Sequence, residues 1–253
     1  MKIYRVLCMF LAMALLKTIG VFVITIVLLI VITFPCALIF LLSKICFKKI
    51  LSLFLYRIAQ WWAQIIIVCT RCPITVTGRD YIPKTGPLCF VSNHGSMFDI
   101  ILMLAYAERP FGFIAKRELL LLPFINLWIT MLGGIFIDRK NIRKAVKTIH
   151  QGVKHIQSGD CMLIFPEGTR SRGKGLLPFR AGALKLATQS GAVIVPVAIS
   201  RSYEVFEKTY RVQVVPVRIT FGEPVITAHI PLTERRQILT EQIRNTISSL
   251  LEV

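Results

Sequence analysis

An uncharged apolar run from Ile19 to Leu42 constrains the fold of this chain more than any other feature. A helix over these residues would be about 36 Å long, because each residue adds about 1.5 Å, and the hydrocarbon core of a bilayer is about 30 Å thick. The run is too long for the apolar core of a cleaved signal peptide. We therefore expect residues 1–60 to form a membrane-embedded helical segment. It could be a helix that spans the bilayer or a helical hairpin in one leaflet.

The charges around this run are positive. Asp80 is the first acidic residue, whereas residues 1–60 carry seven Lys or Arg. Four of these follow the run, which favours a cytoplasmic side for the rest of the chain, at the inner membrane if the source is bacterial. The whole chain has a formal net charge of +18, and such a surface attracts phosphate groups. Together with the apolar front, this charge favours lipid and a phosphorylated substrate over nucleic acid.

Residues 61–253 show the pattern of an α/β domain with a mostly parallel sheet flanked by helices. Short β-branched runs alternate with stretches of helical spacing, of which 142–156 and 239–250 are the clearest. The run 51–68 is amphipathic and contains Trp61 and Trp62, so it could lie at the lipid headgroups or pack as the first helix of the domain. The predicted strands are Ile74–Thr77, Leu88–Ser92, Phe111–Ala115, Ile135–Asp138, Cys161–Phe165, Val193–Ile199 and Val212–Phe221.

The first candidate site motif follows the predicted strand 88–92. It reads Asn-His-Gly-Ser-Met-Phe-Asp, with His94 and Asp99 five residues apart. A helix that begins at Ser96 would place Asp99 in its first turn and direct the carboxylate back to His94. The carboxylate could then hold one imidazole nitrogen and leave the other free as a base. Alternatively, Asp99 only caps the helix and His94 is an ordinary turn residue.

The second motif follows the predicted strand 161–165. Residues 166–175 contain three cations, two hydroxyls and three glycines, a composition suited to binding an anion. Glu167 could hold Arg170 in place or contact a substrate hydroxyl. The segment also matches G-x-x-x-x-G-K, but Gly175 stands where a phosphate loop needs a hydroxyl, so nucleotide hydrolysis is disfavoured. A solvated basic turn is the other interpretation.

Two further cations follow predicted strands and could join the same anion site. These are Lys116 and Arg139, which could equally be ordinary surface charges. Cys69 and Cys72 form one C-x-x-C without a second pair, so we expect no metal site. The sequence has no G-x-S-x-G motif, which leaves a covalent acyl-enzyme unsupported.

Together, these motifs resemble the 1-acyl-sn-glycerol-3-phosphate (lysophosphatidate) acyltransferase family of glycerolipid acyltransferases. The resemblance covers roughly residues 62–221, without the N-terminal front. The motifs that carry it occur in the family's order: Asn93-His94-x-x-x-x-Asp99, a block ending Asp138-Arg139, Phe165-Pro-Glu-Gly-Thr-Arg-Ser171 and Val195-Pro196-Val197.

The resemblance implies a reaction and a role for each matched residue. His94 would be the general base for the sn-2 hydroxyl of 1-acyl-sn-glycerol-3-phosphate, and Asp99 would orient it. The acyl chain would come from acyl-CoA or acyl-carrier protein, giving phosphatidate without a covalent acyl-enzyme or a further cofactor. The expected phosphate-binding residues are Arg170 and Arg139, with Glu167, Gly168 and Thr169 shaping the pocket and Lys116 as a weaker candidate.

Two alternatives stay open. The acceptor could be glycerol-3-phosphate or another lysophospholipid, which the motifs do not separate well. The chain could also be a non-catalytic membrane protein that holds anionic lipid, although binding alone does not need the His94–Asp99 pair. The expected partners are therefore membrane lipid and an acyl donor, with no nucleic acid and an open oligomeric state.

Overall fold

A computed structural model describes residues 2–43, 48–180, 182–227 and 237–252. Lys44, one of the four cations that follow the apolar run, lies outside these residues. The strands are β1 (Ile74–Thr77), β2 (Leu88–Ser92), β3 (Gly112–Lys116), β4 (Ile135–Ile137), β5 (Cys161–Ile164), β6 (Val193–Ser200), β7 (Val217–Phe221) and β8 (Val225–Ile226). The α-helices are α1 (Lys2–Ser43), α2 (Lys48–Thr70), α3 (Phe98–Tyr106), α4 (Ile125–Met131), α5 (Ile142–Gln157), α6 (Lys185–Ser190), α7 (Ser202–Val205) and α8 (Gln237–Glu252). Two 3-10 helices, η1 (Arg79–Tyr81) and η2 (Arg117–Leu121), complete the elements.

The described strands form one sheet in the order β1-β7-β6-β2-β5-β3-β4, with β8 paired to β6. Strands β2 to β6 run parallel to one another. Strands β7 and β8 pair antiparallel with β6, and β1 pairs parallel with β7. All five residues of β2 are buried, as expected for a strand covered on both faces. The predicted mostly parallel sheet flanked by helices is therefore confirmed. Because strands β2 to β6 are parallel, their carboxyl ends all lie at the same edge of the sheet.

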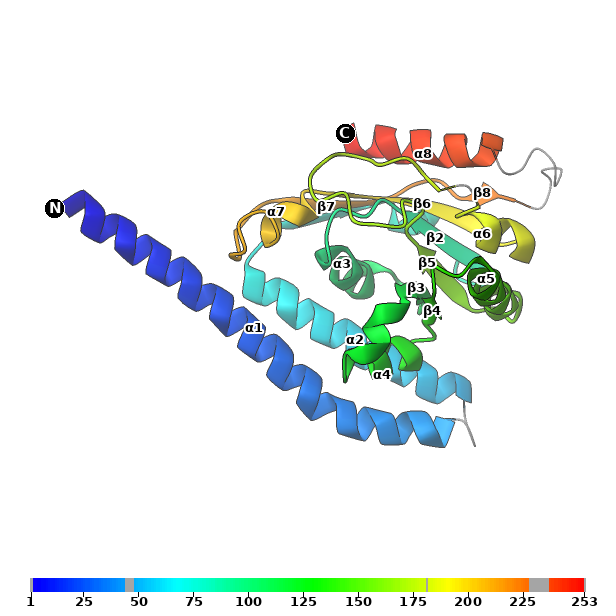
Figure 1. Cartoon of the computed structure of the whole chain (residues 1–253), viewed down its shortest axis with the longest axis horizontal. Helices are drawn as coiled ribbons and strands as arrows, with labels where there is room; N and C mark the ends of the chain where they lie inside the picture. The colour runs from blue at the N-terminus through cyan, green and yellow to red at the C-terminus, as the bar shows by residue number, and fades with distance from the viewer. Residues whose placement is uncertain (1, 44–47, 181, 228–236, 253) are drawn as a thin grey trace.

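Helices cover the sheet on both faces (Figure 1). Helices α2 and α3 share one apolar core with alternate residues of the sheet, among them Leu88 and Phe90. The neighbouring residues Cys89 and Val91 point into the other core, which α5, α6 and α8 close. This alternation follows from the two-residue period of a strand and explains why the strand sequences are apolar throughout.

The strand predictions match the structure closely, with one clear correction. Strands β1 and β2 have the predicted bounds, but β7 begins at Val217 and not at Val212. The reason is Pro216, which lacks the N–H that a ladder needs and which precedes the first paired residue. Val217 then donates its N–H to the Pro73 carbonyl at 2.9 Å, which starts the pairing with β1.

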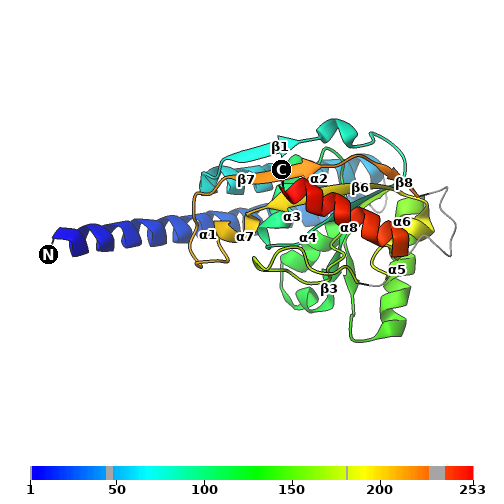
Figure 2. The ribbon, with the colours of Figure 1, turned by 90° about the horizontal axis from the view of Figure 1, so that it is seen from above.

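The N-terminal segment is an antiparallel pair of helices (Figures 1 and 2). A shorter apolar stretch, residues 6–16, lies in the same helix, α1, as the long apolar run. Lys17 Nζ donates to the Thr70 carbonyl at 2.8 Å, and Trp62 Nε1 donates to the Thr25 carbonyl at 3.4 Å. The predicted division between residues 60 and 61 falls within α2, which packs on both α1 and α3.

Much of the surface of α1 is apolar and exposed. Exposed large side chains recur along it from Met13 to Leu42, and an apolar face of that extent is unfavourable in water. Two stretches, Ala12–Leu42 and Lys49–Thr70, are long and apolar enough to cross a membrane by length and composition. The helix pair thus has the surface expected of the predicted membrane anchor.

Candidate active site

The predicted site residues gather at the edge of the sheet where β2 to β6 end. A groove of about 880 Å³ lies along this edge. Six of the eight predicted residues line it: His94, Lys116, Arg139, Gly168, Thr169 and Arg170. The other two, Asp99 and Glu167, are buried behind it. Parallel pairing explains the convergence, since the carboxyl ends of parallel strands meet at one edge.

His94 and Asp99 form a direct pair. His94 Nδ1 lies 2.9 Å from Asp99 Oδ2, and the Asp99 side chain is fully buried. An aspartate oxygen on Nδ1 favours the tautomer that carries its proton there, which leaves the lone pair of Nε2 free. Since His94 lines the groove, that nitrogen can serve a ligand as a proton acceptor.

The start of α3 directs the Asp99 carboxylate. Ser96 Oγ accepts a hydrogen bond from Phe98 N at 3.1 Å, and Asp99 Oδ2 accepts one from Ser96 N at 2.9 Å. Both bonds order the turn that leads into α3. The same Asp99 oxygen therefore bonds this turn and His94 Nδ1.

The imidazole is also held on its face. The His94 ring stacks on Phe165 with a centroid distance of 4.0 Å and an interplanar angle of 17°. Phe165 directly follows β5, so the stacking joins the loop after β2 to the end of β5. With one nitrogen bonded and one face covered, the ring has little freedom to rotate.

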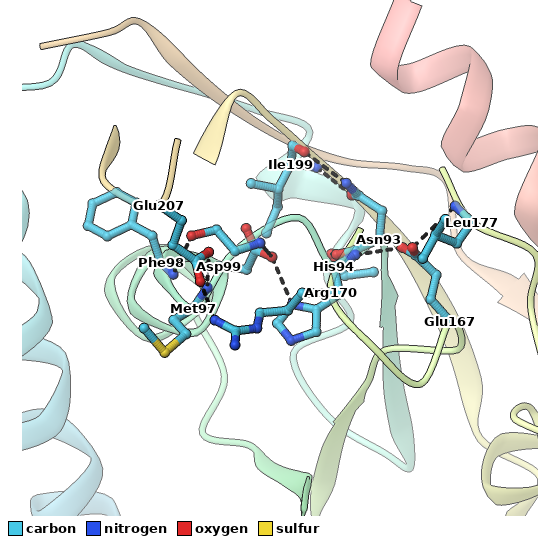
Figure 3. Close-up of polar contacts among 12 residues, drawn as sticks. Asn93, His94, Met97, Phe98, Asp99, Glu167, Arg170, Leu177, Ile199 and Glu207 are labelled. Atoms are coloured by element: carbon cyan, nitrogen blue, oxygen red, sulfur yellow. Dashed lines mark hydrogen bonds and ion pairs between the residues drawn. The ribbon is translucent and has the colours of Figure 1, made fainter. Parts of the chain in front are cut away.

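Glu167 joins the two motif loops from the protein interior. Its Oε1 accepts from His94 N at 2.7 Å and its Oε2 accepts from Leu177 N at 3.2 Å (Figure 3). Burial raises the pKa of this carboxyl, although the two backbone donors partly offset the effect. Ser171 N adds a bond to the His94 carbonyl at 2.7 Å. Glu167 thus positions the His94 backbone, a contact that neither role considered for it describes.

Asn93 anchors the same loop to the neighbouring strand. Its side chain donates to the Ile199 carbonyl at 2.9 Å and accepts from Ile199 N at 2.8 Å. Ile199 lies near the end of β6, so this two-way bond fixes the point at which the chain leaves β2. Asn93 belongs to the first motif, but its hydrogen bonds to Ile199 could not be predicted from a single sequence.

Two arginines lie close together beside the second motif. Arg139 Nη1 donates to the Gly168 carbonyl, and Arg180 Nε donates to the Glu167 carbonyl at 3.2 Å. Partial burial, and then the nearby Arg180 guanidinium, lower the pKa of Arg139. Two guanidinium groups that repel each other in a groove favour a bound anion between them. Arg180 is not among the residues predicted from the motifs because it lies nine residues after Ser171.

The other predicted polar residues have different neighbours. Arg170 Nη1 pairs with Glu207 Oε1, a residue that no motif includes. Lys116 Nζ lies 3.2 Å from Glu118 Oε1, with both side chains more than half exposed. Thr169 is exposed at the groove. Arg170 is therefore a predicted cation whose carboxylate partner is largely buried.

Apolar side chains also line the groove. They come from β3, η2 and α5 and include Phe113, Leu119, Val146 and Ile149. A groove with cations at one part and aliphatic walls elsewhere suits an amphipathic anion. Across the residues that the structure describes, no three His, Cys, Asp or Glu side chains gather as metal ligands.

Gly168 should not tolerate a side chain. Its φ is +68°, and an added Cβ would lie 2.4 Å from Arg180 Nε. We expect Gly168→Ala to lower the free energy of unfolding by about 1–2 kcal/mol and to displace Arg180, which would weaken anion binding. Thermal unfolding and binding of inorganic phosphate would measure the two effects.

Gly175→Ala is the matched control for this substitution. Gly175 lies in the same loop at φ +77°, with no atom within 4 Å of an added Cβ. It should carry the backbone strain without the clash, so its phosphate binding should stay near that of the wild type. Equal losses of phosphate binding in the two variants would contradict a role for the Arg180 contact.

The fold is that of a known structure. The 1-acyl-sn-glycerophosphate (LPA) acyltransferase PlsC from Thermotoga maritima superposes with a TM-score of 0.76, covering 93% of this chain and 96% of that one at 23% sequence identity. Residues 73–200, half of the chain, match the family model described as Acyltransferase. The chain belongs to this acyltransferase family.

Curated relatives carry a more specific description. A Borreliella burgdorferi protein described as 1-acyl-sn-glycerol-3-phosphate acyltransferase is 34% identical over 152 residues, covering 60% of this chain and 58% of the relative. An Escherichia coli protein of the same description is 37% identical over 116 residues, covering 46% and 47%. The chain thus spans about half the length of the curated relatives it matches.

Proposed function

We propose that this protein transfers an acyl chain from a thioester donor to the sn-2 hydroxyl of 1-acyl-sn-glycerol-3-phosphate, giving phosphatidate. The observation that carries the proposal is that one groove holds both His94, oriented by Asp99, and a group of arginines. The family membership and the descriptions of the relatives support the same reaction.

The chemistry needs one base and no covalent intermediate on the protein. His94 Nε2 accepts the proton of the sn-2 hydroxyl as the oxygen attacks the thioester carbonyl. The carbon–sulfur bond then breaks, and the leaving thiolate takes the proton back from His94. Asp99 keeps the ring in place and stabilises the positive charge that forms on it.

The acceptor phosphate would lie among Arg139, Arg170 and Arg180. The remaining N–H groups of these side chains can form charge-assisted hydrogen bonds to phosphate oxygens. Gly168 and Thr169 line the groove beside them, and Lys116 could contribute from the end of β3. The apolar wall would then contact acyl chains.

The donor would be acyl-CoA or acyl-carrier protein, with no further cofactor. We propose that α1 and α2 hold the domain at a membrane with the groove on the cytoplasmic side, the inner membrane in a bacterium. The exposed apolar surface of α1 supports this placement, and an arginine-rich groove beside the membrane could draw in an anionic lipid.

An acyl-transfer assay with several acceptors tests the proposal. Purified protein in detergent or vesicles would receive acyl-CoA or acyl-carrier protein with 1-acyl-sn-glycerol-3-phosphate, glycerol-3-phosphate or 1-acylglycerol. We expect phosphatidate formation to be the fastest reaction, because only this acceptor supplies both a phosphate and an acyl chain. Preference for glycerol-3-phosphate would change the assigned acceptor, and binding of anionic vesicles without any transfer would contradict the proposed function.

A further inference from the structure

Glu207 lies on a segment that follows α7 and returns along α1. The segment is fixed from outside the groove: the rings of Phe206 and Phe22 are 5.0 Å apart, and Val212 N donates to Thr18 Oγ1 at 2.9 Å. The segment therefore has contacts with α1 that do not involve the two motif loops. Figures 1 and 2 show this segment beside α1.

Each carboxylate oxygen of Glu207 meets a different part of the candidate site. Oε1 pairs with Arg170 Nη1, and Oε2 accepts from Met97 N at 3.2 Å (Figure 3). Met97 immediately precedes α3, whose second residue is Asp99. One side chain thus connects the loop after β5, which carries Arg170, with the helix start that directs the carboxylate behind His94.

We propose that Glu207 is a positioning residue for the acceptor phosphate: it holds the Arg170 guanidinium at a set place relative to His94. The proposal rests on the proposed function, since it assigns Arg170 to the acceptor. Glu207 lies outside the predicted motifs. In this proposal it acts through Arg170 and does not contact the substrate.

The physical reason is the cost of ordering a long cation. An unpaired arginine side chain samples many rotamers, and phosphate binding would have to restrict them. Glu207 is only 11% exposed, so its ion pair with Arg170 is less screened than a surface pair. Because guanidinium has five N–H donors, Arg170 can keep Glu207 and still donate to a phosphate. The restriction then occurs during folding and not during substrate binding.

The central test is Glu207→Gln with Glu204→Gln as the matched control. Glutamine keeps an oxygen for Met97 N but loses the charge that holds Arg170. Glu204 lies on the preceding helix and pairs instead with the surface cations Arg201 and Lys208. We expect Glu207→Gln to raise the acceptor KM about tenfold with kcat within about threefold of wild type. Glu204→Gln should change KM less than about twofold.

A double-mutant cycle with Arg170→Ala separates positioning from a general structural effect. Once Arg170 is absent, Glu207→Gln should change the acceptor KM by less than about twofold. An equal increase in both backgrounds would overturn the proposal, as would a fall in kcat and thermal stability with an unchanged KM. Glu207→Asp, which keeps the charge on a shorter side chain, should recover part of the KM.

The wild-type control separates this inference from the proposed function. If wild-type protein fails to acylate 1-acyl-sn-glycerol-3-phosphate, the proposed function fails and the inference falls with it. If wild-type protein is active and Glu207→Gln has the KM of Glu204→Gln, only the role of Glu207 is overturned.

Discussion

Replacing His94 by alanine should lower kcat for acyl transfer by roughly 10²–10⁴-fold, the usual contribution of a positioned proton acceptor. The structure offers His94 Nε2 to the groove while Asp99 holds Nδ1 at 2.9 Å. The arginines that would bind the phosphate remain, so the dissociation constant for 1-acyl-sn-glycerol-3-phosphate should change little. Single-turnover acylation and equilibrium binding of the acceptor would measure the two quantities separately.

His155→Ala is the matched control for that experiment. His155 lies near the C-terminal end of α5, away from the edge where the five parallel strands end, and its loss should leave kcat near the wild-type value. His94→Asn keeps a polar side chain on the loop and is therefore less disruptive to the fold than alanine. It should lose activity to a similar degree if the imidazole is the base. Near-wild-type turnover in a folded His94→Ala protein would refute the base mechanism.

Replacing Asp99 by asparagine should lower kcat by roughly 10²–10³-fold, with a smaller change in the acceptor KM. The amide oxygen can still accept from Ser96 N, but a neutral group stabilises the imidazolium less than a carboxylate does. The Asp99 side chain has no solvent-accessible surface in this fold. Solvent therefore cannot replace the lost charge, and steady-state kinetics would show the split between kcat and KM.

Asp80→Asn serves as the control for this variant. Asp80 lies in η1 and is exposed, so the same chemical change there should leave both kinetic constants unaltered. Thermal unfolding of Asp99→Asn would report any loss of the helix cap. A variant that is less stable but keeps its kcat would indicate that Asp99 acts only as a cap.

Local sequence patterns predicted most of the strands and the two motifs of the candidate site. The bounds of β1 and β2 follow from β-branched or apolar runs closed by turn residues. The error at β7 has a local cause as well, because Pro216 interrupts an apolar run that otherwise resembles a strand. The contact between Ser96 and Asp99 could also be predicted, because the two residues lie only three positions apart.

Contacts between distant segments could not be predicted in the same way. Arg180, Glu207 and the inward-facing Glu167 carboxylate have partners up to 110 residues away. Composition and spacing carry no information about which loop lies beside which. For Glu207, the position also depends on α1, through Phe22 and Thr18.

The sequence by itself determined an apolar helical front, an alternating α/β pattern and two motifs whose residue types suit proton transfer and anion binding. These depend on interactions within a few residues, where propensity and periodicity act. Only the tertiary structure decided that both motif loops share one groove, that Glu167 supports the backbone of His94 and that Glu207 holds Arg170. Those relations arise from the order of parallel strands and the packing of α1, which are settled by the burial of the whole chain and not by any one segment.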